Sequence, residues 1–568
     1  MTRCNSLPET ILPAVLALPD EGSDRPAVIV PATKHAPSTV ASYKDLGASV
    51  TRVQKDLARL GISKEDKVAL VLPNGLEFVG VFLAVIRQRA IAAPLNPQYK
   101  REEYKDILRL MRPSLLICMK EAGQLSSSVL AAQDLDIPVV ACRAEGLDVY
   151  LGGQGPISND SDIPRDVPTY SPSEIQPDDK ALLLFTSGTT GAPKSVALSH
   201  ENLLVAMRII IDAHALSPTD RCMIITPLFH VIGVGGSLLA TLFSGGCVII
   251  PPSLPGQFWQ SCIDFNVTWF HAVPTLHRLL LSFPRPKEEP KLRFIRSGGS
   301  DLAPELYQRM QELGPPVLEV YGMTETAPAI FCNRLDSSTR RPAHYPIAPT
   351  VEVMVLPSRN GTQPQPNASL LTKEPGVMGE ICVRGTSIMT GYMDNPEANE
   401  QAFLAGAFFR TGDMGVIKED GYLQLTGRIK EIINKGGEKI SPSEIDHVVW
   451  SMEGVRESAC FRIPDEIYGE DIGIAVVVES GEVTAAAVKK HVRQHAAMFK
   501  VPKAVRHHFS TNNTSELCTM LINHNHQVLI VDTIPTNRTG KPLRNLMSEQ
   551  YAQGLLVDGK FIQSNAAK

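Results

Sequence analysis

The chain has 568 residues, of which 43% are hydrophobic and 20% are charged, and its formal net charge is −5. This length exceeds what one hydrophobic core usually holds, so we expect more than one domain. A slightly acidic charge balance gives no reason to expect binding to nucleic acid or to an anionic membrane.

Apolar, strand-like runs recur along most of the chain and alternate with helical stretches. The run KVALVLP at Lys67–Pro73, for example, precedes the helical stretch LEFVGVFLAVIRQ at Leu76–Gln88. Strands that alternate with helices predict parallel sheets with helices packed on their faces. Further strand-like runs are LLICM, ALLLF, CMIITP, CVIIPP, WFHAVP, FIRSGG and VLEVYG.

The pattern changes after Asp413. Short strand-like runs around the turn in KEDGY indicate antiparallel pairing, and from about Ile429 onward the order of strands and helices predicts a compact α+β unit. The sequence therefore predicts an α/β protein with a large N-terminal domain over residues 1–427 and a small α+β C-terminal domain over residues 428–568.

The segment LFTSGTTGAPKSVALSH, at Leu184–His200, looks like a phosphate-binding loop. It is not a Walker A loop, because Pro193 stands where that motif needs a glycine before the lysine, and because VAL at 196–198 reads as a strand rather than a helix. Glycine still permits close approach to phosphate, and hydroxyl groups donate hydrogen bonds. The alternative interpretation is a Gly/Thr-rich surface turn.

Four further segments follow in order: VYGMTETAP (Val320–Pro328), RTGDMG (Arg410–Gly415), GRIKEIINKGGEKISPSEID (Gly427–Asp446) and PTNRTGKPLR (Pro535–Arg544). Together with the phosphate loop they resemble the acyl-adenylate-forming superfamily, which includes acyl-CoA synthetases, 4-coumarate–CoA ligases, luciferases and nonribosomal peptide adenylation domains. The resemblance runs from about Ala27 to the C-terminus. The wording RIKEIINKGGEKISPSEID looks most like the branch that contains peroxisomal CoA synthetases and oxalate–CoA ligases.

The resemblance implies an ATP-dependent carboxylate–CoA ligase whose substrates are a small carboxylic acid, ATP and coenzyme A, with Mg²⁺ as the metal. A carboxylate attacks the α-phosphate of ATP, pyrophosphate leaves, and the thiol of coenzyme A then attacks the acyl carbon of the acyl-AMP. The first step brings anions together, so positive charge and backbone N–H groups must point at the phosphates.

The resemblance gives catalytic roles to Lys541, Thr324, Glu325 and His230. Lys541 would bridge the attacking carboxylate and the α-phosphate, and the alternative is a solvated lysine in a Gly-Pro turn. Glu325 would bind the magnesium ion and Thr324 would contact the α-phosphate; Thr324 could equally cap a helix. His230 would form the gate of the acyl tunnel, although a histidine in an apolar run is more often a core residue.

Other residues would hold the nucleotide and coenzyme A. Asp413 would accept both ribose hydroxyls, since a carboxylate can take two hydrogen bonds, and Tyr321 would stack on adenine. Arg428 would act at the ribose and phosphate, and Lys430 would be the hinge about which a mobile small domain rotates between the two steps. The remaining predicted binding residues are Thr186, Ser187, Gly188, Thr189, Thr190, Gly191, Lys194, Gly298, Gly299, Ser300, Gly322, Gly436 and Gly437.

The sequence departs from the family pattern at three places. Ser195 stands where the family has a glycine after the lysine, and no glycine occurs between Arg340 and Pro349, near the border of the acyl pocket. The polar segment Arg506–Gln527 interrupts a strand that approaches Lys541. A loop and a read-through artefact of the gene model are the favoured interpretations of this insertion. A metal-binding histidine cluster is the least favoured, because its histidines lack regular ligand spacing.

Two other functions compete with the ligase. The chain could load a carrier-protein thiol, and that carrier would be a separate molecule, because no LGGxS-type segment follows Arg544. It could also be a non-catalytic pseudo-ligase, which the presence of Glu325, Asp413 and Lys541 disfavours. The branch resemblance points to oxalate or another short polar acid, and a medium fatty or aromatic acid is the alternative.

The sequence also bears on location in the cell. The N-terminal MTRCNSLPET lacks the apolar centre of a secretory signal, and the tail QSNAAK is not a peroxisomal S-K-L address. No apolar run reaches the roughly 18 residues of a membrane span. The ten cysteines form no C-x-x-C pair, which fits reduced thiols. We therefore expect a cytoplasmic protein.

Overall fold

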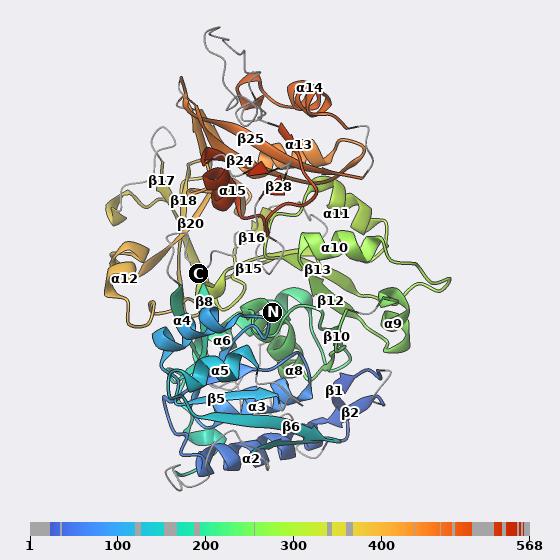
Figure 1. Cartoon of the computed structure of the whole chain (residues 1–568), viewed down its shortest axis with the longest axis vertical. Coiled ribbons are helices and arrows are strands. Elements are labelled where there is room, and N and C mark those ends of the chain that lie inside the picture. Colours follow the sequence, from blue (N-terminus) through green and yellow to red (C-terminus); the bar gives the residue numbers. More distant parts are fainter. Residues whose placement is uncertain are drawn as a thin grey trace, which may run out of the picture.

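Layered sheets and helices form the large N-terminal part of the chain in the computed structural model, and a smaller α+β unit lies at one end (Figure 1). The structure describes residues 23–33, 37–119, 126–152, 167–186, 193–254, 256–337, 344–358, 367–436, 438–465, 467–479, 483–502, 528–536, 541–553, 556–557 and 560–561. Among these residues no helix has the length and apolar character needed to cross a membrane.

A seven-stranded sheet has the order β7-β6-β5-β3-β4-β8-β9. Its central strands are parallel, as predicted, and the edge strands β7 and β9 are antiparallel to their neighbours. The strands are β3 (Lys67–Val71), β4 (Ile91–Pro94), β5 (Leu115–Met119), β6 (Val139–Glu145), β7 (Asp148–Leu151), β8 (Lys180–Thr186) and β9 (Lys194–Ser199), with helices α2 (Tyr43–Arg59), α3 (Leu76–Arg87), α4 (Arg101–Met111), α5 (Ser127–Gln133) and η1 (Pro172–Glu174).

An eight-stranded sheet has the order β15-β14-β13-β12-β10-β11-β1-β2, and the strands from β14 to β1 run parallel. The strands are β1 (Pro26–Val30), β2 (Thr39–Ser42), β10 (Arg221–Met223), β11 (Cys247–Ile249), β12 (Trp269–Ala272), β13 (Phe294–Gly298), β14 (Val317–Tyr321) and β15 (Phe331–Cys332). The helical segments are α6 (His200–His214), α7 (Val231–Gly233), the π-helix η2 (Val234–Leu239), α8 (Ala240–Phe243), α9 (Phe258–Asp264), α10 (Pro274–Leu281) and α11 (Pro304–Gln311).

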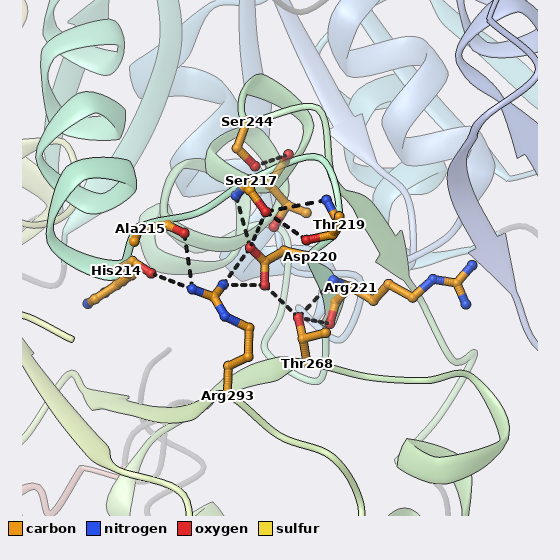
Figure 2. A network of polar contacts seen from close by, with 10 residues as sticks. His214, Ala215, Ser217, Thr219, Asp220, Arg221, Ser244, Thr268 and Arg293 are labelled. Carbon is orange, nitrogen blue, oxygen red and sulfur yellow. Dashed lines mark hydrogen bonds and ion pairs between the residues drawn. The ribbon is translucent and has the colours of Figure 1, made fainter. Parts of the chain in front are cut away.

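Asp220 holds the amino ends of the parallel strands β10, β12 and β13 together (Figure 2). Its buried carboxylate accepts hydrogen bonds from Arg293 at 2.5 and 2.6 Å and from Thr268 Oγ1 at 2.7 Å. Arg293 also donates to the backbone oxygens of His214 and Ala215, at the end of α6. These contacts fix the edge of the sheet from which the strands run toward their carboxyl ends, where ligands bind in α/β folds.

A third sheet of six antiparallel strands has the order β16-β21-β20-β18-β17, with β19 paired to β20. The predicted antiparallel pairing after Asp413 is confirmed by β20 and β21, but antiparallel pairing begins earlier in the chain, with β17 and β18. The elements are η3 (Thr324–Thr326), β16 (His344–Pro346), β17 (Val351–Pro357), η5 (Ala368–Leu370), β18 (Met378–Gly385), α12 (Pro396–Ala402), β19 (Phe403–Leu404), β20 (Phe408–Ile417) and β21 (Tyr422–Arg428).

The C-terminal unit has a core of its own, which includes Ile433, Ile445, Ile474 and Val528. Its five-stranded sheet has the order β23-β22-β25-β24, with β26 paired to β25. The predicted insertion Arg506–Gln527 lies outside the described residues. The elements are β22 (Ile433–Lys435), β23 (Glu438–Ile440), α13 (Pro442–Trp450), β24 (Val455–Asp465), β25 (Gly469–Val478), α14 (Ala485–His495), η6 (Met498–Lys500), β26 (Val528–Ile530), α15 (Arg544–Ala552), β27 (Leu556–Val557) and β28 (Lys560–Phe561).

Candidate functional site

A pocket lies beyond the carboxyl ends of β13 and β14, between the eight-stranded sheet and the C-terminal unit. Residues from far apart in the sequence meet there, as the sequence motifs predict. From the C-terminal unit the pocket also receives His447, Trp450 and Arg544. The predicted site residues that line it are Gly299, Ser300, Tyr321, Gly322, Asp413, Arg428 and Lys541.

Asp413 is the polar centre of this pocket. Its Oδ2 accepts a hydrogen bond from Tyr321 Oη at 2.6 Å, and its Oδ1 lies 2.9 Å from Arg428 Nε. Asp413 and Arg428 are register partners on β20 and β21, so the ion pair follows from the strand pairing. Burial, together with the adjacent carboxylate, raises the pKa of Tyr321, and Asp413 raises the pKa of Arg428. Tyr321 therefore remains a hydrogen-bond donor and Arg428 a cation.

Lys541 reaches the pocket from the C-terminal unit. Its Nζ lies 3.4 Å from Glu431 Oε1, and Arg544 Nε lies 3.4 Å from the other oxygen of the same carboxylate. Burial and the nearby Arg428 lower the pKa of Lys541, and Glu431 and Asp413 act in the opposite direction. The sequence motifs contain Glu431 and Arg544, but nothing in the sequence alone shows that they hold Lys541 in place.

Glu325 lies on η3, where Tyr392 Oη donates a hydrogen bond of 2.9 Å to its Oε1. The Nζ of Lys194 lies 4.6 Å above the ring of the same tyrosine. Burial raises the pKa of the Glu325 carboxyl, and the hydrogen bond from Tyr392 opposes that shift. Tyr392 was not predicted from the sequence, because it lies in a loop 67 residues away from Glu325.

Close contacts require glycine at three of the predicted positions. A Cβ on Gly298 would lie 2.6 Å from Val320 Cγ2, and a Cβ on Gly322 would lie 1.9 Å from the backbone oxygen of Pro328. Gly436 has a φ of +59°, and a Cβ there would lie 2.8 Å from a ring carbon of Tyr468. A side chain at any of these positions would collide with its neighbours, so glycine is required there.

The structure describes only some of the remaining predicted site residues. Thr186 ends β8 opposite Lys194, which begins β9, and the predicted residues Ser187, Gly188, Thr189, Thr190, Gly191 and Gly437 lie outside the described residues. Ser195 is buried within β9. Thr324 begins η3, and Lys430 follows β21, where its backbone oxygen accepts a hydrogen bond from Arg462.

His230 precedes α7 and does not line the pocket. Its ring packs against Phe229, with the centroids 4.9 Å apart, and its Nε2 has no hydrogen-bond partner among the residues that the structure describes. Burial lowers its pKa to about 4, so the ring is neutral at physiological pH. This environment fits a core histidine as well as a gate.

Comparison with known protein families identifies the family to which the chain belongs. Residues 19–393 match the family model described as AMP-binding enzyme. The chain belongs to the AMP-binding enzyme family. Residues 444–514 match the AMP-binding enzyme C-terminal domain.

Relatives of this AMP-binding enzyme agree with that assignment over nearly the whole chain. The acyl-CoA synthetase FUM10 of Gibberella moniliformis is 52% identical over 573 residues, which cover 96% of this chain and 99% of the relative. An oxalate–CoA ligase of Saccharomyces cerevisiae is 33% identical and covers 94% and 95%. The crystal structure of ATP-bound MatB from Rhodopseudomonas palustris superposes with a TM-score of 0.78 at 26% identity, covering 96% and 99%.

The predicted fold class, family and reaction are thereby confirmed. The protein is an AMP-forming acid–thiol ligase that uses ATP and coenzyme A and proceeds through an acyl-AMP. The sheets, helices and smaller C-terminal domain have the arrangement of acyl-CoA synthetase-like adenylating enzymes.

Proposed function

We propose that the pocket between the large and small domains is the site of both half-reactions of this ligase. The observation that carries this proposal is the meeting of Asp413, from the large domain, with Lys541, from the small domain, around one pocket. In this arrangement Asp413 accepts the ribose hydroxyls, because a carboxylate offers about four lone-pair sites and its two protein partners leave some of them available. Tyr321 stacks on adenine, and Arg428 forms an ion pair with the Asp413 carboxylate.

In the first half-reaction an oxygen of the acid attacks the α-phosphate, and the bond between that phosphate and pyrophosphate breaks. Lys541 places one positive charge between the attacking carboxylate and the α-phosphate, which lowers the repulsion between the two anions. The Glu431 carboxylate, 3.4 Å from Nζ, holds the lysine in the pocket before the substrates arrive. Thr324 donates to the α-phosphate, and the loop Thr186–Gly191 with Lys194 holds the outer phosphates.

In the second half-reaction the small domain rotates about Lys430 and carries Lys541 out of the pocket. The sulfur of coenzyme A then attacks the acyl carbon, the carbon–oxygen bond to AMP breaks, and AMP leaves. Coenzyme A passes the backbone at Gly436 and Gly437, where the absence of a Cβ permits close contact. In this structure Tyr468 packs on Gly436, so its side chain must move for coenzyme A to approach.

The magnesium ion would be held by Glu325 together with phosphate oxygens. A single buried carboxylate fits this metal, because Mg²⁺ at nucleotide sites is usually bound by one or two carboxylates plus substrate phosphates. The ion would neutralise charge on the phosphates, and the Tyr392 hydroxyl would orient the Glu325 carboxylate toward it.

Coenzyme A, rather than a carrier protein, is the proposed acceptor, and the relatives named as CoA synthetase and CoA ligase support this choice. A short polar acid is the proposed substrate, in line with the relative named oxalate–CoA ligase.

The test is pyrophosphate release across a panel of carboxylic acids, with and without coenzyme A. A coenzyme A ligase forms an acyl-CoA product with at least one acid, and acyl-AMP accumulates when the thiol is withheld. An enzyme that loads a carrier would release pyrophosphate but form no acyl-CoA. Absence of pyrophosphate release with every acid would contradict the proposed function.

A further inference from the structure

Arg296 is a fully buried cation in the eight-stranded sheet of the large domain. It lies on β13, two residues before Gly298, and its side chain faces the helical segment that follows His230. Its Nη2 donates to Ser237 Oγ on η2 at 2.9 Å, and its Nε donates to His271 Nδ1 on β12 at 3.2 Å. Its guanidinium also lies 4.7 Å above the ring of Trp269.

This guanidinium has no counter-ion among the residues that the structure describes. Its Nη1 also has no hydrogen-bond partner there. Burial lowers its pKa to about 10, and the groups that oppose this shift are the thiols of Cys222 and Cys332 rather than carboxylates. Arg296 is therefore still charged at neutral pH. Burying a charge without a partner is costly, so such a residue needs a reason beyond packing.

A second unpartnered donor lies beside it. Because His271 Nδ1 accepts the hydrogen bond from Arg296 and the ring is neutral, its Nε2 carries the hydrogen, and this Nε2 has no partner among the described residues. Arg296 and His271 thus each keep one buried donor that has no partner among the described residues.

Two glycines pack closely against the side chains of Arg296 and His271. A Cβ on Gly236 would lie 3.4 Å from Arg296 Nη2 and 2.9 Å from Ile232 Cδ1, and a Cβ on Gly298 would lie 3.3 Å from His271 Cε1. Gly299, which follows Gly298, lines the catalytic pocket. Along the chain, only Ser297 and Gly298 separate the buried cation from this pocket-lining residue.

We propose that Arg296 is a specificity-determining residue that pairs with a second anionic group, such as a carboxylate, on the acid that the enzyme activates. This inference rests on the proposed function, and it narrows the substrate to acids that carry an anionic group in addition to the reacting carboxylate. The incoming anion supplies the missing counter-ion and accepts a hydrogen bond from Nη1. An acid that lacks a second anionic group leaves the buried charge of Arg296 unpaired, so the enzyme discriminates against that acid.

The experiment compares malonate, succinate and glutarate with their monomethyl esters, which keep the length but remove the second charge. In the wild-type enzyme we expect the best diacid to exceed its ester by about 10²–10³-fold in kcat/KM for pyrophosphate release, as for loss of one partner of a buried ion pair. Arg296→Met should remove most of this preference by raising KM for the diacid. The kcat/KM for the ester should stay the same or increase.

Two further variants and a stability measurement separate specificity from structure. Arg221→Met is the matched control, because Arg221 lies on β10 of the same sheet and donates to the Phe265 backbone oxygen at 2.8 Å; it should keep the wild-type preference. Arg296→Met should keep or raise the thermal midpoint, since it removes an uncompensated buried charge. If Arg296→Met does not fold, Arg296→Lys retains the cation and should still prefer the diacid.

Failure of this inference is distinct from failure of the proposed function. If pyrophosphate is released with uncharged fatty or aromatic acids and each ester equals its diacid, the ligase function stands and the role of Arg296 is wrong. The same holds if Arg296→Met lowers the rates with diacid and ester equally, or if Arg296→Lys uses both members of a pair alike. If no acid of either class releases pyrophosphate, the proposed function itself fails.

Discussion

Tyr321 donates a hydrogen bond to Asp413 across 2.6 Å, and this contact joins two different sheets of the large domain at the edge of the pocket. Tyr321 ends β14 of the eight-stranded sheet, and Asp413 lies in β20 of the antiparallel sheet. Arg428 occupies the other oxygen of the carboxylate. The orientation of Asp413 is therefore set before a nucleotide binds, which is the preorganisation that efficient binding needs.

Asp413→Asn should weaken the nucleotide complex. The amide has only one oxygen, so it loses both the charge and one acceptor, and a hydrogen bond to a charged group is worth about 1.5–3 kcal/mol. We expect KM for ATP to rise by about 10–100-fold, with a much smaller change in KM for the acid. Tyr321→Phe removes one donor but keeps the charge, so its effect on KM for ATP should be smaller. An unchanged KM for ATP in Asp413→Asn would contradict the assigned role.

Lys541→Ala should separate the two half-reactions. Adenylation loses one preorganised positive charge, which typically costs about 10²–10³ in rate, whereas transfer from supplied acyl-AMP to coenzyme A should be largely retained. In the wild-type enzyme, burial lowers the pKa of Lys541, so the lysine loses its charge and adenylation declines as the pH rises. This decline should begin at a pH below the ordinary lysine value of about 10.4.

The control for this pH effect is Lys541→Arg, which stays charged at all accessible pH values and should lose the alkaline decline even if its rate is lower. Pyrophosphate release and thioester formation are measured separately across pH. An equal loss of both half-reactions in Lys541→Ala would show that the lysine does not leave the site between the steps.

The sequence motifs contain about half of the pocket residues, because a segment such as VYGMTETAP or RTGDMG contributes its side chains from one short stretch. The partners of those side chains were not predictable. Tyr392 meets Glu325, and Glu431 meets Lys541, only through the packing of elements from different parts of the chain. Arg296 sits in the run FIRSGG, which reads as an ordinary core strand, and its missing counter-ion becomes visible only when every neighbour is known.

The fold was predictable to a similar degree. The strand at Lys67–Val71 and the helix at Leu76–Arg87 occupy the predicted places, because each has a strong local pattern. The π-helix Val234–Leu239 was not predicted. A run rich in glycine and leucine gives no sign of its helical hydrogen-bond pattern, and its glycines pack closely against Pro328.

The hinge assignment predicts a selective defect. Lys430→Pro fixes the backbone φ angle, so it should hinder rotation of the small domain. In this structure Lys541 lines the pocket with Asp413, so adenylation should survive while thioester formation falls. Lys430→Ala is the matched control, because it removes the side chain and leaves the backbone free. Loss of adenylation with intact thioester formation in the proline variant would place the hinge elsewhere.

His214 should make the large domain sensitive to acid. Its ring is fully buried against Phe294, with the centroids 5.1 Å apart, and neither ring nitrogen has a hydrogen-bond partner among the described residues. Burial, with the nearby Arg296 and Arg293, holds its pKa well below the usual 6.5. In the unfolded chain the imidazole takes up a proton near pH 6.5, whereas the folded protein resists protonation.

The unfolded state therefore binds more protons below pH 6.5, so this contribution to stability is complete above that pH and is lost as the pH falls. A single group of this kind contributes up to about 1.4 kcal/mol per pH unit. His214→Phe keeps an aromatic ring in the site and removes the titration. Its thermal midpoint should fall less steeply between pH 6.5 and pH 5 than that of the wild-type protein. As a control, His495→Phe changes an exposed ring and should leave the wild-type pH dependence intact. If His214→Phe retains the full acid sensitivity, other groups are responsible for it.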